Sequence, residues 1–169
     1  MRWAKELKEK NFIILDTETT GLGSNDEIVQ LGVIDKEGNT LIDSLIKPTI
    51  PIGEGASRVH GIDDEMVANA PMFVEVFPLL EECARRVDVI VAYNAPFDSR
   101  MIAQSCRKHG LPMIANPWFC VMRSYANGGR WKKLTEACAS LHINIDVAAH
   151  SAVGDCLRTL ALIREMEKR

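Results

Sequence analysis

The chain has 169 residues, of which 47% are hydrophobic and 25% are charged, and these proportions are typical of one globular domain spanning residues 1–169. A formal net charge of −3 excludes an overall basic field. Any binding of nucleic acid would therefore depend on a local patch or on bound cations.

Three strands are predicted near the N-terminus, after a short charged segment. Residues 12–15 form an unbroken β-prone apolar run that ends at Asp16, which is typical of a central strand covered on both faces. Residues 28–34 and 40–46 flank a turn-forming stretch and predict an antiparallel hairpin. Residues 48–63 contain two prolines and three glycines, so we expect a loop there, long enough to suspect a function.

Helices and strands alternate in the remainder of the chain. The pattern predicts helices at 72–86, 95–109, 133–141 and 151–167, and strands at 88–92 and 118–122. A hairpin followed by this alternation predicts an α/β fold, a mixed five-stranded sheet flanked by helices. Gly21 and Gly23 lack the third glycine and the helix start of a dinucleotide fingerprint, so no nucleotide cofactor is expected.

The five cysteines favour a reduced protein. They are widely spaced, odd in number and without a Cys-x-x-Cys pair, so they are expected to be buried core residues rather than zinc ligands. The N-terminus carries charges where a signal peptide needs an apolar run, and no segment approaches the roughly 20 apolar residues of a membrane span. We predict a cytoplasmic protein with no membrane partner.

Two carboxylates stand at the end of the first predicted strand. Asp16 and Glu18 are two residues apart, so their side chains leave the same face of the strand. Like charges that close repel each other unless a cation lies between them. The alternative is that this segment is only a structural turn, because Asp, Thr and Gly are all turn-forming residues.

Asp98 lies near the centre of an apolar helical stripe formed by Phe97, Met101 and Ile102. The side chain is therefore predicted to face the sheet, although burying an isolated carboxylate is costly unless a metal, a positive partner or a cap relieves the cost. The alternative is that Asp98 caps the first turn of its own helix, a contribution of about 1 kcal/mol.

The last predicted helix begins at a third polar segment. Ser151 is a candidate N-cap, His150 comes just before it, and Asp155 falls in the first helical turn, where the positive helix end favours a carboxylate. Taken singly, Asp155 could be a surface acid that complements the helix dipole, and His150 an ordinary loop histidine.

Together, three segments resemble the three exonuclease motifs of the DEDDh, or DnaQ-like, family. They are residues 16–21 (Asp-Thr-Glu-Thr-Thr-Gly), 93–98 (Tyr-Asn-Ala-Pro-Phe-Asp) and 150–155 (His-Ser-Ala-Val-Gly-Asp). Their order and spacing match, and residues 59–62 (Val-His-Gly-Ile) resemble a tetrapeptide common in the proofreading members. The step from His150 to Asp155 indicates the histidine branch. Two residues depart from the pattern: Tyr93 stands where a histidine often precedes Asn-Ala, and Gln30 where many members carry Glu.

The resemblance implies a ribonuclease H-like exonuclease fold and a two-metal mechanism. Two Mg²⁺ or Mn²⁺ ions would be held by Asp16, Glu18, Asp98 and Asp155, with His150 as the general base. The reaction would release nucleoside 5′-monophosphates from the 3′ end of mainly single-stranded DNA, preferred over RNA. A DNA polymerase partner is conceivable, and the choice between monomer and homodimer is open. Residues expected to contact the substrate are Thr19, Gly21, Leu22, His60 and Phe97.

Other functions stay open at this point. The same fold and acids also serve exoribonucleases that trim RNA ends or short oligoribonucleotides. A non-catalytic adaptor is disfavoured because all five chemical positions are present, and a metal-dependent nucleotide hydrolase is a weaker option. Basic and aromatic side chains are also mixed in the segment from Arg123 to Lys133, a composition typical of grooves that bind single strands. The alternative is a solvated basic turn in which Trp131 is buried in the core.

Overall fold

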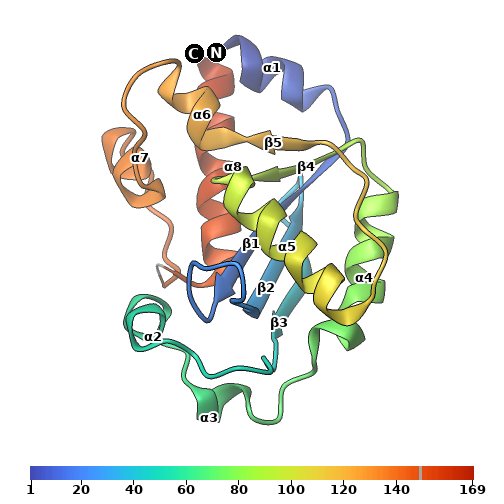
Figure 1. Ribbon diagram of the computed structural model, residues 1–169. Helices are drawn as coiled ribbons and strands as arrows, with labels where there is room; N and C mark the ends of the chain where they lie inside the picture. Colours follow the sequence, from blue (N-terminus) through green and yellow to red (C-terminus); the bar gives the residue numbers. More distant parts are fainter. Residues whose placement is uncertain (149) are drawn as a thin grey trace.

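Five strands form one mixed sheet in the order β3-β2-β1-β4-β5 in the computed structural model, which describes residues 1–148 and 150–169 (Figure 1). β1 (Phe12–Thr19) is central: it pairs antiparallel with β2 (Ile28–Asp35) and parallel with β4 (Val89–Ala92). β3 (Thr40–Leu45) and β5 (Trp118–Cys120) form the edges. The predicted mixed five-stranded sheet, with its first strand at the centre, is confirmed.

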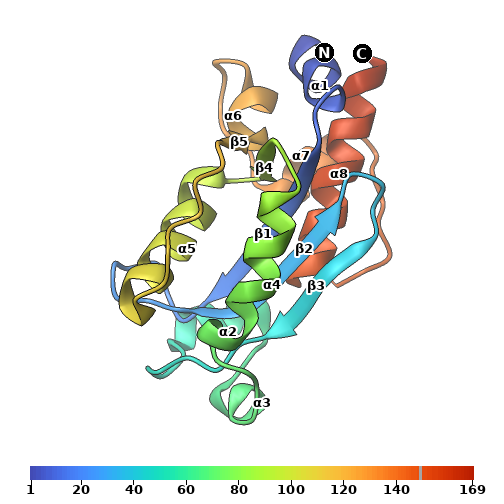
Figure 2. The same ribbon diagram turned by 90° about the vertical axis from the view of Figure 1, so that its right-hand side faces the viewer.

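Helices cover both faces of the sheet (Figure 2). α8 (Ala152–Lys168) packs on one face against β1 and β2, and α1 (Arg2–Lys8) and α7 (Leu134–Ser140) pack against α8. α4 (Phe73–Arg85) and α5 (Ala95–His109) cover the other face. Among the described residues, no helix is both long and apolar enough to span a membrane.

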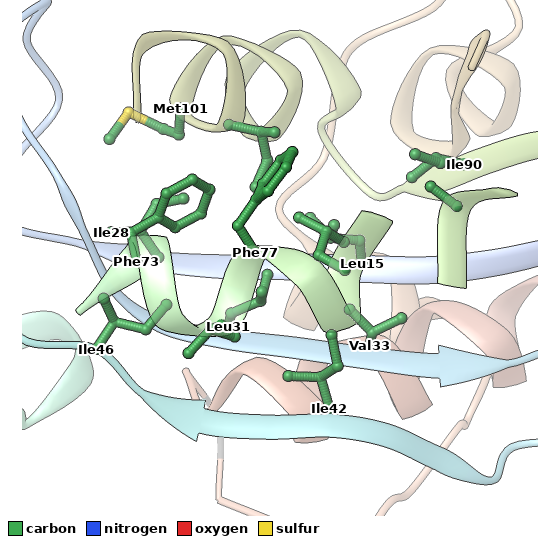
Figure 3. Close-up of a cluster of buried hydrophobic side chains, with 14 of the residues drawn as sticks. Leu15, Ile28, Leu31, Val33, Ile42, Ile46, Phe73, Phe77, Ile90 and Met101 are labelled. Carbon is green, nitrogen blue, oxygen red and sulfur yellow. The ribbon is translucent and has the colours of Figure 1, made fainter. Parts of the chain in front are cut away.

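The two faces of β1 explain its unbroken apolar sequence. Ile13 and Leu15 pack into the cluster that holds Phe73 and Phe77 of α4, part of which is drawn in Figure 3, whereas Ile14 packs into the cluster on the α8 side. Because side chains alternate along a strand, Asp16 and Glu18 leave β1 on the α8 side, and Thr17 leaves it on the α5 side.

The start of α8 lies directly against β2. The backbone N–H of Ala152 donates to the Gln30 carboxamide at 2.9 Å, and Gln30 is the β2 partner of Glu18. A side chain at Gly32 would place its Cβ 2.6 Å from the backbone nitrogen of Val153, so only glycine allows this close approach. Since β1 and β4 are parallel and α5 follows β4, the start of α5 lies at the same edge of the sheet.

Four short helices were not predicted. The expectation of a loop over residues 48–63 is wrong in part, because α2 (Glu54–His60) lies inside it, followed by α3 (Asp64–Val67). Gly53 precedes the first turn of α2, and Gly61 ends it in the left-handed conformation with φ 73°, so the glycines that indicated a loop flank a helix. α1 and α6 (Val121–Ala126) were also missed, and the strand predicted at 118–122 ends at Cys120.

Candidate active site

Four carboxylates from three elements converge at the edge of the sheet where β1 ends. Asp16 and Glu18 come from β1, Asp98 from the first turn of α5, and Asp155 from the first turn of α8. The sheet register is irregular between Glu18 and Thr19, as is common beside functional sites, where a bulge re-aims side chains. The fold therefore brings together all four predicted acids.

Asp98 is only 3% exposed, as its place on the apolar stripe predicted. Its carboxylate accepts hydrogen bonds from the backbone N–H of Thr17 at 3.1 Å and from the Thr17 hydroxyl at 2.8 Å. The N-cap of α5 is Asn94, so the alternative that Asp98 caps its own helix is wrong. Asp98 instead fixes the start of α5 to the C-terminal part of β1.

Burial and mutual repulsion raise the pKa of these acids. Burial raises the pKa of Asp16 well above its ordinary value, and the charges of Asp98, Asp155 and Glu18 raise it further. Burial, with help from Asp155 and Asp98, raises the pKa of Glu18 to about 8. Burial raises the pKa of Asp98 to about 7 even though the Thr17 hydrogen bonds oppose the shift. The cluster therefore resists carrying its full negative charge without added cations.

Arg158 is the only basic side chain that forms an ion pair with these four acids within residues 1–148 and 150–169. The residue is only 8% exposed, and its guanidinium donates to the Asp155 carboxylate at 3.1 Å, to the backbone carbonyl of Ala148 at 3.1 Å and to that of Val147. Burial raises the pKa of Asp155, and Arg158 and His150 oppose that shift. Arg158 thus ties Val147 and Ala148 to the first turns of α8.

His150 stands immediately before this helix, whose N-cap is Ser151 as predicted: the Ser151 hydroxyl accepts from the Gly154 N–H at 3.2 Å. His150 is exposed and adopts a left-handed backbone conformation with φ 61°. Glu18, His150 and Asp155 each offer one ligand atom, and these atoms lie within 4.8 Å of one another. Carboxylate oxygens crowded in this way, with a single arginine to balance them, fit hard divalent cations.

The raised pKa values predict how the stability of the metal-free protein depends on pH. In the folded protein, Glu18 stays protonated from its ordinary pKa of 4.5 up to about pH 8, and Asp98 from its ordinary pKa of 3.8 up to about pH 7. In the unfolded chain, both residues have lost their protons over this range. The folded state then binds more protons, so stability decreases as pH rises through this window. We expect the melting temperature in EDTA to fall between about pH 4 and about pH 8 and then to level off.

Excess Mg²⁺ should flatten this dependence, because bound cations stabilise the ionised acids. Circular dichroism melts with and without Mg²⁺ measure the effect. Glu18→Gln should show a shallower decline in EDTA than the unmodified chain. An equally steep decline in that variant would contradict the assignment.

The contacts of Arg158 predict a loss of activity even for the variant that keeps its charge. Lysine at 158 retains a cation beside Asp155, but a single ammonium cannot replace the planar fork that reaches the carboxylate and two carbonyls. We expect Arg158→Lys to lower kcat roughly 10- to 100-fold through misplacement of His150. Hydrogen exchange should be faster at the amides of residues 143–148.

A double-mutant cycle separates this role from a general loss of stability. If Arg158 acts by placing His150, the effects of Arg158→Lys and His150→Gln on kcat should be far from additive. Additive effects, or full activity of Arg158→Lys, would contradict the positioning role.

A cavity of about 450 Å³ lies beside Glu18, between the end of β1, α2 and the start of α5. The five residues predicted to contact the substrate all line it, namely Thr19, Gly21, Leu22, His60 and Phe97. Leu22 is 78% exposed, and His60 is held in place by the Thr19 carbonyl, 2.9 Å from Nε2, and by the Ile62 N–H, 3.0 Å from Nδ1. The cavity thus offers apolar walls and backbone groups next to the acids.

Sequence reasoning missed three residues that support the site. Thr17, the middle residue of Asp-Thr-Glu, was given no role in the sequence analysis, and Gln30 was noted only as a departure from the family pattern. The signal for Arg158 was present, because residues three apart on a helix are neighbours, and Arg158 follows Asp155 by three. No sequence pattern indicated its bonds to Val147 and Ala148.

Comparison with known proteins identifies the family of the chain. The profile of the RNase T exonuclease family matches residues 13–163. An uncharacterized exonuclease of Escherichia phage 186 is 35% identical over 180 residues, covering 98% of this chain and 92% of that protein. The PolC-type DNA polymerase III of Caldanaerobacter subterraneus is 38% identical over 107 residues, which cover 61% of this chain but only 8% of the polymerase.

A solved structure shows the same architecture. Exonuclease X, in complex with 5′-overhanging duplex DNA, matches with a TM-score of 0.73 and 28% identity over 93% of this chain and 92% of that one. The resemblance predicted from the three motifs, and the ribonuclease H-like fold that it implied, are confirmed. The chain belongs to the RNase T family of exonucleases and is a nuclease.

Proposed function

We propose that the chain is a 3′-to-5′ exonuclease that removes nucleotides from single-stranded DNA ends with the aid of two divalent cations, Mg²⁺ or Mn²⁺. One observation carries the proposal: four carboxylates from β1, α5 and α8 meet beside a cavity that has the size of a small-ligand pocket. The direction of cleavage follows the resemblance to DEDDh exonucleases.

Each residue of the site has a role in this proposal. Asp16, Glu18 and Asp155 hold the ions, and Asp98, locked to Thr17, supports the assembly from the α5 side. When bound, such ions lower the pKa of the attacking water and stabilise the leaving oxygen. His150 accepts the proton of that water, since imidazole exchanges protons readily near neutral pH.

The cavity orients the end of the substrate. Phe97 and the exposed Leu22 offer apolar contact to the terminal nucleoside, and His60 and the backbone around Thr19 and Gly21 offer polar contacts. A nucleotide held there has its 5′-phosphate directed to the acids, and hydrolysis releases it as a nucleoside 5′-monophosphate.

The test compares 5′-labelled single-stranded DNA, duplex DNA with a mismatched 3′ end and single-stranded RNA, each with Mg²⁺. Progressive shortening of DNA from the 3′ end is the expected result, and a circular single strand should resist digestion. Internal nicking of the circle would refute exonucleolytic action. Shortening of RNA alone would overturn the DNA preference in favour of an exoribonuclease. No hydrolysis of any substrate would favour an adaptor.

A partnership with a DNA polymerase belongs to the same proposal. It is supported by the likeness to a short part of the PolC-type polymerase. Faster removal of a mismatched than of a paired 3′ end would support proofreading.

A further inference from the structure

A second cavity, of about 550 Å³, opens beside His150 and Asp155. Its remaining wall is formed by Tyr93 and Asn94 at the end of β4, by Met122 of α6, and by residues 131–135, which lead into α7. We call it the 131–133 groove. None of its lining residues is among those that line the cavity beside Glu18, so the acid cluster is bordered by two separate spaces.

The groove carries positive charge that is not neutralised. Within the described chain, no carboxylate lies within ion-pair distance of the Lys132 or Lys133 ammonium, whereas the neighbouring Arg130 is paired with Glu136 at 3.6 Å. Two unpaired ammonium groups therefore stand within reach of a polyanion that enters at His150. Phosphates of a nucleic-acid strand have the complementary charge.

Trp131 adds an aromatic surface to this charge. It is 57% exposed, so the alternative that it is buried in the core is wrong. The Arg123 guanidinium lies 5.7 Å from the Trp131 ring centre, and the Lys132 ammonium lies 5.7 Å from that of Tyr125. Exposed aromatic rings flanked by cations are typical of surfaces on which bases of single strands stack.

The groove is anchored to the sheet by a residue that departs from the family pattern. The hydroxyl of Tyr93, a side chain only 7% exposed, donates to the backbone carbonyl of Lys132 at 2.7 Å. Histidine at this position would not place a hydroxyl there. Tyr93 therefore fixes residues 131–133 relative to Asn94 and the start of α5.

We propose that the 131–133 groove binds the nucleotides on the 5′ side of the scissile phosphate, with Lys132 and Lys133 contacting their phosphates and Trp131 stacking on a base. This inference rests on the proposed function, in which the terminal nucleotide occupies the cavity beside Glu18. A strand whose scissile phosphate lies at the acids has to continue outward, and the groove begins at His150 and Asp155. The occupant is a nucleic-acid strand rather than an acidic protein segment because the groove begins at His150 and Asp155, where the proposed function places the scissile phosphate.

The test uses two substrates that differ only in whether they can reach the groove. Thymidine 5′-(p-nitrophenyl phosphate) carries the terminal nucleotide and a small leaving group, and an eight-nucleotide oligothymidylate carries the following nucleotides as well. The variants are Lys132→Gln/Lys133→Gln and Trp131→Ala. The control is Lys5→Gln/Lys10→Gln, which removes the same charge from exposed lysines near the N-terminus.

We expect kcat/KM for the oligonucleotide to fall roughly tenfold in each groove variant, and the ratio of oligonucleotide to p-nitrophenyl ester activity to fall roughly fivefold or more. The dependence of oligonucleotide binding on salt should become shallower by about 0.7 per lost phosphate contact. The control should match the unmodified chain on both substrates.

Equal losses on both substrates would overturn the inference, because the groove residues would then act on the reaction itself. No loss on either substrate would also overturn it and would leave an acidic protein segment as the occupant. If the unmodified chain hydrolyses neither substrate, the proposed function has failed rather than the groove. Melting temperatures of the variants confirm that each is folded.

Discussion

Asp16→Asn should lower kcat about 10³-fold or more, and it should also raise the melting temperature of the metal-free protein by a few degrees. Burial and the charges of all three other carboxylates raise the pKa of Asp16, so its ionised form carries an electrostatic cost in the absence of cations. A neutral amide of the same shape removes that cost together with the ion-binding charge. Oligonucleotide cleavage and thermal melts in EDTA measure the two effects.

The opposite signs of these effects make the experiment informative. A variant that merely misfolds would lose activity and stability together. Asp43→Asn, the same change at an exposed position of β3, is the matched control and should leave both quantities unchanged. Substantial activity of Asp16→Asn would refute its role as an ion ligand, and a lower melting temperature in EDTA would refute the electrostatic cost assigned to it.

His150→Gln should lower kcat by about 10²- to 10⁴-fold, the usual contribution of a general base, with a much smaller effect on KM. The acids and both cavities stay in place, so Ca²⁺-supported binding of a labelled oligonucleotide should persist. His150 is exposed, and exogenous imidazole should therefore restore part of the activity of His150→Ala.

The control for this change is His142→Gln. His142 is also exposed and also has a left-handed backbone, with φ 55° against 61° for His150, so the two substitutions strain the chain alike. Only the change at 150 should affect catalysis. If His150→Gln keeps its turnover, another group accepts the proton.

Periodicity predicted the sheet and its long helices because those elements bury wide apolar faces. Alternation along β1 places Ile14 on one covered face and Leu15 on the other, and the apolar stripe of α5 placed Asp98 inward. The short helices escaped prediction for the converse reason. α2 has no buried residue, and glycines at its ends resemble those of a loop.

The four acids of the candidate site could be predicted from the sequence, whereas the contacts that hold the surrounding segments in place could not. Asp16, Glu18 and Asp155 stand at the ends of elements that the pattern locates. The bonds of Arg158 to Ala148 and Val147 join residues 10 and 11 positions apart, and the bond of Tyr93 to Lys132 joins residues 39 positions apart. Contacts of this kind arise from tertiary packing, which a single sequence does not report.

Both chain ends lie together at the side of the molecule away from α2 and α3, as Figures 1 and 2 show. α1 packs against α8 there, with Lys8 and Glu167 paired at 3.6 Å, whereas the acids lie at the other end of β1. Either end can therefore be joined to a tag, a solid support or another protein while the reactive edge faces solvent. Immobilised in this way, the enzyme could meet long strands without the attachment obstructing their entry.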